Sequence, residues 1–314
     1  MRIFVIGATG YLGSHVARHL AAAGHAVTGL SRSSAGDAVV TAAGATPVRG
    51  DLGEIGPLLE IATRHEAIIY TAQLLLEAEH RTIAAILDRL AGSDRTLIFT
   101  SGTGLLSQRT DGDWSEDSFA EDDPFVPSKY IGFRLVTETL VRAAGWSGRL
   151  RTMVVRPPMI WGHGGSGHLA MFYRDALTHG EVGYLGRGLN LYSNVHVDDL
   201  AALYGLVLER GTAGALYHAV AGEVNNRTQA EAVARDLGLP ARSLSFDEAV
   251  ARWGKFGALI GMAVCSRSRA PRSRRELGWQ PRHLDLMDDI GHAAYRRLAG
   301  AEGEAPRALA ENRP

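Results

Sequence analysis

Short apolar runs alternate with longer amphipathic segments through the first half of the chain. The runs have the length of buried strands, and the segments between them carry apolar residues at helical spacing. This alternation is typical of βαβ units. We therefore predict an α/β fold built on a doubly wound parallel sheet of Rossmann type, with a smaller C-terminal substrate lobe. The predicted strands are residues 3–6, 26–31, 46–48, 67–71, 97–100 and 152–155.

Three of the helices between these strands are the clearest. Each is followed by a glycine, which we expect to take the left-handed conformation that turns the chain back towards the sheet. These helices are predicted at residues 12–23, 81–91 and 130–144, and they end before Gly24, Gly92 and Gly145.

The alternation breaks at RPPMIWGHGGSGH, where proline and glycine exclude a regular element. Strand and helix patterns resume further on, in LYSNVHVDDLAALYGLVLER and ALYHAV. We predict a dinucleotide-binding domain made of residues 1–157 and 192–221, and a substrate lobe made of residues 158–191 and 222–298. Residues 299–314 are rich in alanine, glutamate, arginine and proline and have no core-facing period, so we expect a disordered tail there.

The first predicted strand leads directly into a loop that contains Gly7, Gly10 and Gly13, and a helix follows at once. Such a turn lets backbone N–H groups approach a pyrophosphate at the positive end of the helix dipole. A side chain at Gly7 or Gly10 would hold the phosphate away, and one at Gly13 would push the helix off the strand. The loop predicts a dinucleotide site, and the alternative is a tight turn that binds no ligand.

The end of the second strand distinguishes NADP from NAD. An acidic residue there binds the ribose 2′-hydroxyl of NAD, whereas an arginine pairs with the 2′-phosphate of NADP. This strand runs into Arg32 and Ser33, which favour NADP. The alternative is NAD, with Asp37 as the ribose ligand and Arg32 in solvent. Asp51 follows the third strand and either accepts a hydrogen bond from the adenine amino group or caps a helix.

A reductase of this architecture needs a proton donor and a nearby cation. Tyr130 and Arg134 lie four residues apart, on one face of the predicted helix, and Glu138 continues that face. A cation beside a tyrosine favours the phenolate and lowers the tyrosine pKa. The competing pair, Phe125 and Lys129, lacks a hydroxyl and is interrupted by a proline. We therefore assign Tyr130 as the proton donor, with a tyrosine that only packs in the core as the alternative.

Two hydroxyl groups follow the strand LIFT, at the carboxyl edge where open parallel sheets bind ligands. Thr103 is our first choice for the hydroxyl that orients a substrate carbonyl, and Ser101 is the second. Serine and threonine are also common turn residues, so an ordinary turn is the alternative.

Taken in order along the chain, these motifs resemble the extended branch of the short-chain dehydrogenase/reductase family, which includes nucleotide-sugar epimerases, dehydratases and 3β-hydroxysteroid dehydrogenase-like proteins. GATGYLG resembles the family's cofactor loop, RGDL its adenine contact, AIIYTAQ its fourth strand and LIFTSGTG the strand with the catalytic serine or threonine. RPPMIWG resembles the segment that closes over the nicotinamide, while NVHVDDLA and ELGWQP resemble C-terminal signatures. The resemblance extends to about Tyr295. It implies further cofactor contacts at Thr9, Tyr11, Leu12, Leu52, Thr71, Ala72, Gln73 and Pro157.

Two features depart from the family pattern. The usual Tyr-x-x-x-Lys appears here as Tyr130 to Arg134, with Glu138 and Arg156 at the spacing that supports this register. Arginine keeps the positive charge that would hold the cofactor ribose, but it is planar and cannot carry a proton as lysine does. EAEHRTIAAI also lacks the asparagine that the family often has there. Catalysis that is slow, altered or absent therefore stays open.

The substrate lobe offers less specific candidates. HGGSGH resembles a flexible loop beside a pocket, with His163 and His168 as candidate contacts. No further cysteine or acidic residue accompanies the two histidines at ligand spacing, so we predict no metal site. The aromatic and apolar candidates would suit a substrate ring, with simple core packing as the alternative. They are Trp161, Met171, Tyr184 and Tyr192.

Composition narrows the class of partner. The chain has 33 basic and 34 acidic residues and a formal charge of −1, which favours a small-molecule substrate over nucleic acid or an anionic membrane. Its single cysteine, Cys265, has no internal partner, and no apolar run is long enough to span a bilayer. MRIFVIGATG predicts a strand and not a signal peptide, so we expect a cytoplasmic protein. The family resemblance implies a homodimer that pairs through the helices predicted near residues 81 and 130.

Three functions fit these observations. The first is an NADP-dependent oxidoreductase that reduces a ketone or oxidises a secondary alcohol on a small organic substrate, cyclic or open-chain. The second is an epimerase or dehydratase of a nucleotide-linked sugar, which takes a hydride and returns it to the same molecule. The third is a sensor that binds NADP(H) without chemistry.

Overall fold

The computed structural model describes residues 1–300, and its largest element is a seven-stranded sheet in the order β11-β7-β5-β4-β1-β2-β3. Every neighbouring pair of strands in this sheet is parallel. The chain moves outward from β1 to β3 and then crosses back from β4 towards β11, which makes the sheet doubly wound and confirms the predicted fold class. The strands are β1 (Arg2–Ile6), β2 (Ala26–Ser31), β3 (Thr46–Arg49), β4 (Ala67–Tyr70), β5 (Thr96–Thr100), β7 (Arg151–Arg156) and β11 (Leu216–His218).

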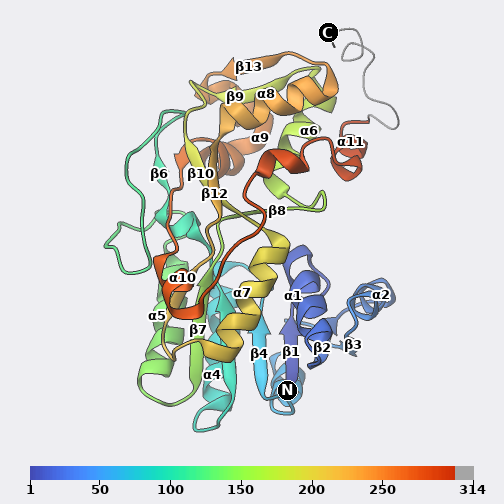
Figure 1. Cartoon of the computed structure of the whole chain (residues 1–314), viewed down its shortest axis with the longest axis vertical. Coiled ribbons are helices and arrows are strands. Elements are labelled where there is room, and N and C mark those ends of the chain that lie inside the picture. The colour runs from blue at the N-terminus through green and yellow to red at the C-terminus, as the bar shows by residue number, and fades with distance from the viewer. Residues whose placement is uncertain (301–314) are drawn as a thin grey trace.

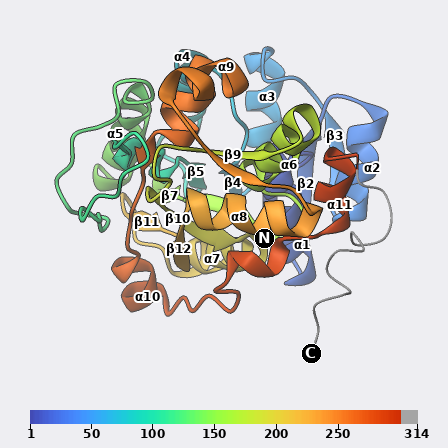
Figure 2. The ribbon, with the colours of Figure 1, turned by 90° about the horizontal axis from the view of Figure 1, so that it is seen from above.

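Successive side chains of the central strands enter two separate cores, because neighbours along a strand point to opposite faces. Ile3 and Val5 of β1 pack in one core and Phe4 and Ile6 in the other, and all four are fully buried. Helices therefore cover both faces of the sheet, as Figures 1 and 2 show. One layer holds α1 (Tyr11–Ala22), α2 (Ser34–Ala42) and α7 (Val197–Arg210), and the other holds α3 (Ile55–Ala62), α4 (Leu76–Leu90) and α5 (Phe133–Trp146).

A second lobe stands over the carboxyl edge of this sheet (Figure 1). Its own core gathers Trp161, Phe172, Tyr173 and Tyr295, all of them buried. Its strands form small sheets: β8 (Met159–Trp161) with β10 (Leu191–His196) and β12 (Gly222–Asn225), β9 (Val182–Leu185) with β13 (Ala241–Leu244), and β6 (Gln108–Arg109) with β14 (Val264–Cys265). Its helices include α6 (Gly167–His179), α8 (Asn226–Leu237), α9 (Phe246–Phe256) and α11 (Ala293–Leu298).

Residues 271–279 lie on the first lobe, although the sequence pattern predicts them in the substrate lobe. Helix α10 (Pro271–Leu277) packs against α7 and β11. Leu277 and Trp279 are buried in the core that α1 and α7 share, and the Trp279 indole donates to the Asp199 carbonyl oxygen. Burial of these two side chains against α7 explains why the chain returns to the first lobe.

Two helices begin where the sequence did not predict. Helix α4 begins at Leu76 instead of residue 81, and α5 begins at Phe133 instead of Tyr130. The residues before α5 form tight turns, with Ile131 N–H donating to the Ser128 carbonyl, while Ser128 N–H is held by the Leu105 carbonyl. These contacts dock the segment on the 3-10 helix η1 (Thr103–Leu106) and delay the start of α5.

Of the three predicted terminal glycines, two have the expected left-handed conformation and one does not. Gly24 and Gly92 have φ of 86° and 75° and confirm the left-handed turns expected of them. The prediction for Gly145 is wrong, because α5 continues to Trp146 and the left-handed residue is Gly148, with φ of 69°. A Cβ on Gly145 would lie 2.3 Å from the Gly214 backbone nitrogen, so close packing is what requires this glycine.

Within residues 1–300, no helix combines the length and the apolar character that crossing a bilayer needs. The predicted tail begins at Ala299 and Gly300, which follow α11, and its remaining residues lie outside the described part of the chain.

Candidate active site

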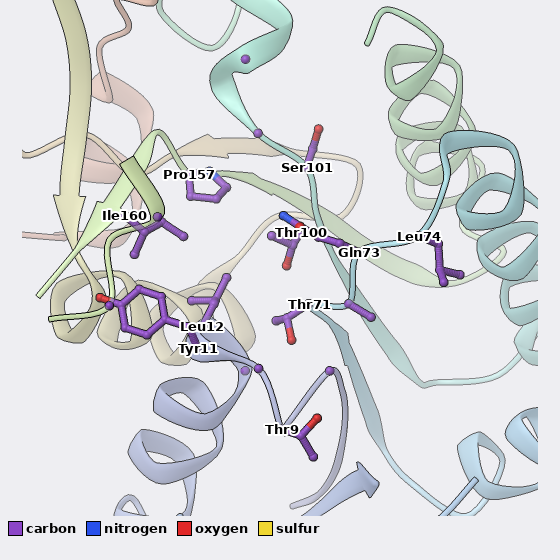
Figure 3. Close-up of a pocket in the computed structure, with 18 of the residues that line it drawn as sticks. Thr9, Tyr11, Leu12, Thr71, Gln73, Leu74, Thr100, Ser101, Pro157 and Ile160 are labelled. Atoms are coloured by element: carbon purple, nitrogen blue, oxygen red, sulfur yellow. The ribbon is translucent and has the colours of Figure 1, made fainter. Parts of the chain in front are cut away.

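A cavity of about 1050 Å³ lies along the carboxyl ends of the parallel strands, between the sheet and the second lobe. Figure 3 shows side chains from both sides pointing into it. The cavity brings together residues that are far apart in the sequence and that the motifs had singled out. The predicted residues that line it are Gly7, Thr9, Gly10, Tyr11, Leu12, Gly13, Arg32, Asp51, Leu52, Thr71, Ala72, Gln73, Ser101, Thr103, Arg134 and Pro157.

The glycine loop has the close backbone contacts that the sequence predicted. Gly7 has φ of +94°, and a Cβ there would lie 2.7 Å from the Ala72 backbone nitrogen. A Cβ on Gly13 would lie 2.1 Å from the Gly7 carbonyl oxygen, so this glycine lets α1 meet β1. Helix α1 follows Gly10, and within the described chain neither a side-chain cap nor a first-turn acid occupies its amino end. Its first amides are therefore available to a phosphate, and the loop fits a dinucleotide.

The rim beside β2 carries an exposed arginine. Nη1 of Arg32 lies 3.9 Å from Oδ2 of Asp51, and both side chains are more than half exposed. The other oxygen of Asp51 accepts a hydrogen bond from Gly53 N–H at 2.7 Å. Ser33 uses its hydroxyl to cap α2 and is not among the described residues that line the cavity. Asp37, the alternative ribose ligand, is paired with Arg49 at 2.6 Å.

Two hydroxyl side chains stand at the end of β5. Backbone hydrogen bonds from Ser101 to Val155 (2.8 Å) and from Thr103 to Pro157 (3.0 Å) fix the segment against β7. Ser101 is buried, and its Oγ has no hydrogen-bond partner in the described residues. An unpaired buried hydroxyl costs free energy unless a ligand satisfies it. This hydroxyl is therefore poised to bind a polar atom in the cavity.

Arg134 reaches the cavity from α5 and is held by a buried carboxylate. Its Nε and Nη2 donate to the two oxygens of Glu79 on α4 at 3.0 and 3.1 Å. Burial raises the pKa of Glu79, and the charge of Arg134 opposes that rise. A second buried pair joins Arg156 of β7 to Glu138 of α5. These pairs lock α5 to α4 and to the sheet, and they fix the position of the Arg134 cation.

Tyr130 does not share the face of α5 that carries Arg134, because the helix begins three residues later. The tyrosine lines a separate cavity of about 740 Å³ with Lys129, whose ammonium lies 5.0 Å from the tyrosine ring centroid. Its side chain is 40% exposed. The expected grouping of Tyr130 with Thr103 is therefore not present in this structure.

Three of the six substrate candidates also lie elsewhere. Trp161 and Tyr184 are buried in the core of the second lobe, where the Trp161 indole donates to Asn194 at 2.9 Å. His163 is exposed and pairs with Asp198 at 2.8 Å. None of the three is among the described residues that line the main cavity.

The second-lobe wall of the main cavity includes two of the other candidates, His168 and Tyr192, together with Met159 and Ile160. The rings of His168 and Tyr192 are 5.4 Å apart, and each is anchored, His168 to Asn226 (2.9 Å) and Tyr192 to the Ile260 carbonyl (2.7 Å). Met159 and Ile160 were missed, although they lie inside the RPPMIWG motif. The motif alone did not show which of its side chains turn inward.

Comparisons with known proteins show what this chain is similar to. The model of the family described as "NAD dependent epimerase/dehydratase family" matches residues 3–221. An uncharacterized protein of Schizosaccharomyces pombe is 34% identical over 305 residues, which cover 94% of this chain and 100% of that protein. The 4-hydroxy-2-methyl-3-oxo-4-farnesyl-3,4-dihydroquinoline-1-oxide ketoreductase of Stigmatella aurantiaca is 28% identical over 312 residues, which cover 92% of this chain and 89% of the ketoreductase.

A solved structure shares the same fold. The dTDP-glucose 4,6-dehydratase of Bacillus anthracis, in complex with NAD, has a TM-score of 0.75 over 95% of this chain and 96% of its own, at 16% sequence identity. At that identity the likeness shows the fold alone.

Proposed function

The chain belongs to the NAD dependent epimerase/dehydratase family, and from this premise we propose that it is an NADP-dependent oxidoreductase that reduces a ketone or oxidises the corresponding secondary alcohol. One observation carries the proposal. A single cavity runs from the glycine loop to the hydroxyls of Ser101 and Thr103, at the edge of the sheet where ligands of such folds bind. A dinucleotide bound at the loop would therefore extend along the cavity towards those hydroxyls.

The preference for NADP rests on the rim beside β2. Arg32 is exposed there, and its fork of N–H donors suits a 2′-phosphate. The acid that would instead favour NAD, Asp37, is already engaged by Arg49. Removal of a charged hydrogen bond of this kind costs about 1.5–3 kcal/mol.

The reaction is a hydride transfer, and bound NADPH supplies the hydride. Thr103 and Ser101 donate hydrogen bonds to the substrate carbonyl oxygen, which hold the carbonyl in place and stabilise the charge that develops on oxygen. Arg134, fixed by Glu79, would supply positive charge to hold the cofactor ribose. Because arginine keeps its proton, the proton given to the product oxygen comes from another group.

We assign that proton to Tyr130, which requires α5 to gain one turn. The residues before α5 already make successive i to i+3 hydrogen bonds, from Ile131 to Ser128 and from Arg134 to Ile131. Such turns commonly continue an α-helix at its ends. A helix extended to Tyr130 would stack that side chain over Arg134, one turn away, and so bring it to the cavity.

The substrate we propose is a small organic ketone, cyclic or open-chain. Met159 and Ile160 offer apolar contact, and the anchored pair His168 and Tyr192 offers flat rings against which a substrate ring can stack. The Stigmatella relative is named for a ketone that is part of a ring system. Trp161, His163 and Tyr184 have no part in this proposal, because they lie outside the cavity.

A second candidate function is an NADP(H) sensor without catalysis. The specific observation in its favour is that Tyr130 lies outside the main cavity. An epimerase or dehydratase of a nucleotide-linked sugar is the third outcome that the test must separate.

The test is an assay of purified protein with NADPH and a panel of cyclic and open-chain ketones. Steady oxidation of NADPH at 340 nm, coupled to formation of the alcohol, supports the oxidoreductase. Turnover of a nucleotide sugar with no net change in cofactor would instead establish an epimerase or dehydratase. Tight NADPH binding without turnover of either class would establish the sensor, and failure to bind either nicotinamide dinucleotide would overturn all three.

We further propose a homodimer that pairs through α4 and α5. Phe133 and Val136 of α5 are 41% and 50% exposed, and their spacing of three residues puts them on one face of the helix. Sedimentation equilibrium should give twice the chain mass, and a monomer at micromolar concentration would exclude this pairing.

A further inference from the structure

Histidine and acidic side chains from four distant segments meet on the surface between the two lobes. His15 comes from α1, His163 from the loop after β8 and Asp198 from the first turn of α7. One ligand atom from each of these three residues lies within 4.8 Å of the other two. His196 and His283 stand behind them, with their rings stacked 4.0 Å apart.

We propose that His15, His163 and Asp198 bind a divalent transition-metal ion of the Zn²⁺ class. Two imidazole nitrogens and one carboxylate oxygen are a ligand set that Zn²⁺ accepts, and the fourth position is left for water. The site is open to solvent, because the side chains of His163 and Asp198 are 56% and 45% exposed. Sequence reasoning missed it because the ligands become neighbours only in the folded chain.

The ligands are oriented before any ion arrives. Nδ1 of His15 lies 2.9 Å from the Tyr11 carbonyl oxygen, which fixes the proton on Nδ1 and leaves Nε2 free as the ligand atom. His163 is a non-glycine residue with φ of +52°, held between Gly162 and Gly164, which also have positive φ. A positive φ is energetically costly for a residue with a side chain, and it persists only where the surrounding structure enforces it. It directs Nε2 of His163 to within 2.8 Å of Oδ2 of Asp198.

A second row of side chains supports the three ligands. His163 and His196 pack edge to face at 5.2 Å, and Nδ1 of His196 accepts a hydrogen bond from Asp198 N–H. The second row of side chains thus braces the first turn of α7, which presents Asp198.

The site joins the loop after β8 to α1 beside the cofactor cavity. The Tyr11 hydroxyl donates to the Gly162 carbonyl at 2.7 Å, and a Cβ on Gly165 would lie 2.1 Å from the Tyr11 ring. Gly165 and Gly167 line the cavity. An ion held by His15 and His163 would therefore pin this loop against α1 and tighten the wall of the cavity.

The experiment uses tag-free full-length protein without any dinucleotide, so its result does not depend on the proposed function. Zn²⁺ is titrated calorimetrically, and Co²⁺ is followed by its visible d–d absorption, which reports nitrogen and oxygen ligands directly. We expect one equivalent of either metal per chain. His163→Ala and Asp198→Asn should each weaken binding by about 100-fold or more and abolish the Co²⁺ spectrum.

The matched control is His179→Ala, which removes an exposed histidine at the end of α6, outside the cluster. It should leave the affinity and the spectrum unchanged. Thermal unfolding checks the fold of each variant, and Zn²⁺ should raise the Tm of the parent and the control but not of the two site variants. Equal binding by the parent and by His163→Ala, or no stoichiometric binding at about 100 μM metal, would overturn the proposal.

Discussion

The two ends of the main cavity differ in how completely the structure assembles them. At the glycine loop, Gly7 and Gly13 are packed so closely against neighbouring backbone that no side chain fits. At the hydroxyl end, Ser101 and Thr103 are in place, while Tyr130 faces a different cavity. The cofactor end is thus built by backbone geometry, whereas the catalytic end depends on how one segment before α5 docks.

This contrast has a physical origin. The glycine loop connects a buried strand directly to a helix, and its conformation follows from positive φ and close packing. The segment around Tyr130 is instead held by a backbone hydrogen bond from Ser128 to Leu105, by the tight turns that follow and by Arg156, which lies over the ring of Phe125. Val126 and Tyr130 of this segment are 88% and 40% exposed, so we expect its conformation to respond to ligands while the glycine loop stays rigid.

The largest expected effect comes from breaking the rigid end, because it lowers both the affinity for NADPH and the stability of the fold. Gly13→Ala places a Cβ 2.1 Å from the Gly7 carbonyl oxygen, which must shift. Overpacking of this kind costs about 1–3 kcal/mol, so NADPH affinity should fall by about 100-fold and the Tm should drop. The matched control is Gly56→Ala in α3, where a Cβ meets open space. Unchanged NADPH binding in Gly13→Ala, measured by fluorescence titration, would remove the loop from the site.

The next effect tests the adaptable end. Tyr130→Phe removes the proposed proton donor, and loss of a general acid lowers kcat by about 100-fold or more. NADPH affinity should stay the same, because the substitution removes only the hydroxyl that gives a proton to the substrate oxygen. Steady-state kinetics and a binding titration on the same preparation separate the two quantities. Full activity in this variant would move the proton transfer to another residue.

A smaller effect sharpens the assignment of the cofactor. Arg32→Ala should weaken NADPH binding by about 10-fold to 100-fold and leave NADH binding unchanged, since only the 2′-phosphate is lost as a partner. The matched control is Arg18→Ala, an exposed arginine on α1 that is not part of the cavity. Equal losses for both dinucleotides would show that Arg32 does not read the 2′-phosphate.

The smallest expected effect is on how the stability of the protein depends on pH. It concerns His218, whose backbone anchors the long loop that precedes Tyr130. Glu121 of that loop accepts a hydrogen bond from His218 N–H at the end of β11. Burial, reinforced by the charge of Arg156, lowers the pKa of the His218 imidazole to about 3. The unfolded chain takes up this proton below about pH 6.5. The stability due to neutral His218 is therefore complete above that pH and is lost as the pH falls towards 3.

Denaturant unfolding at pH 7, 6 and 5 measures this loss, which one group limits to about 1.4 kcal/mol per pH unit. His218→Gln should flatten the dependence of the free energy of unfolding on pH. The same slope in the variant and the parent would assign the acid sensitivity to other groups.

Particular residues show how far sequence reasoning reached. Gly7, Arg32, Ser101 and Arg134 were each identified from motifs, and the fold brings all four to one cavity. Tyr130 was identified by spacing, but the helix that would have aligned it begins at Phe133. Residues spaced by four share a helical face only where the helix is formed. The backbone hydrogen bond from Ser128 to Leu105, which delays the start of α5, cannot be read from the sequence.

By itself the sequence determined what local chemistry controls. Alternating apolar residues set the strands and their two buried faces, and glycines without a Cβ set the loop that meets α1. The tertiary structure decided what depends on contacts between distant segments, which include the inward turn of Met159 and Ile160, the burial of Trp161 and the meeting of His15 with His163. The reason is that local conformation is limited by sterics at each residue, whereas the neighbours of a side chain across the fold are fixed only when the whole chain packs.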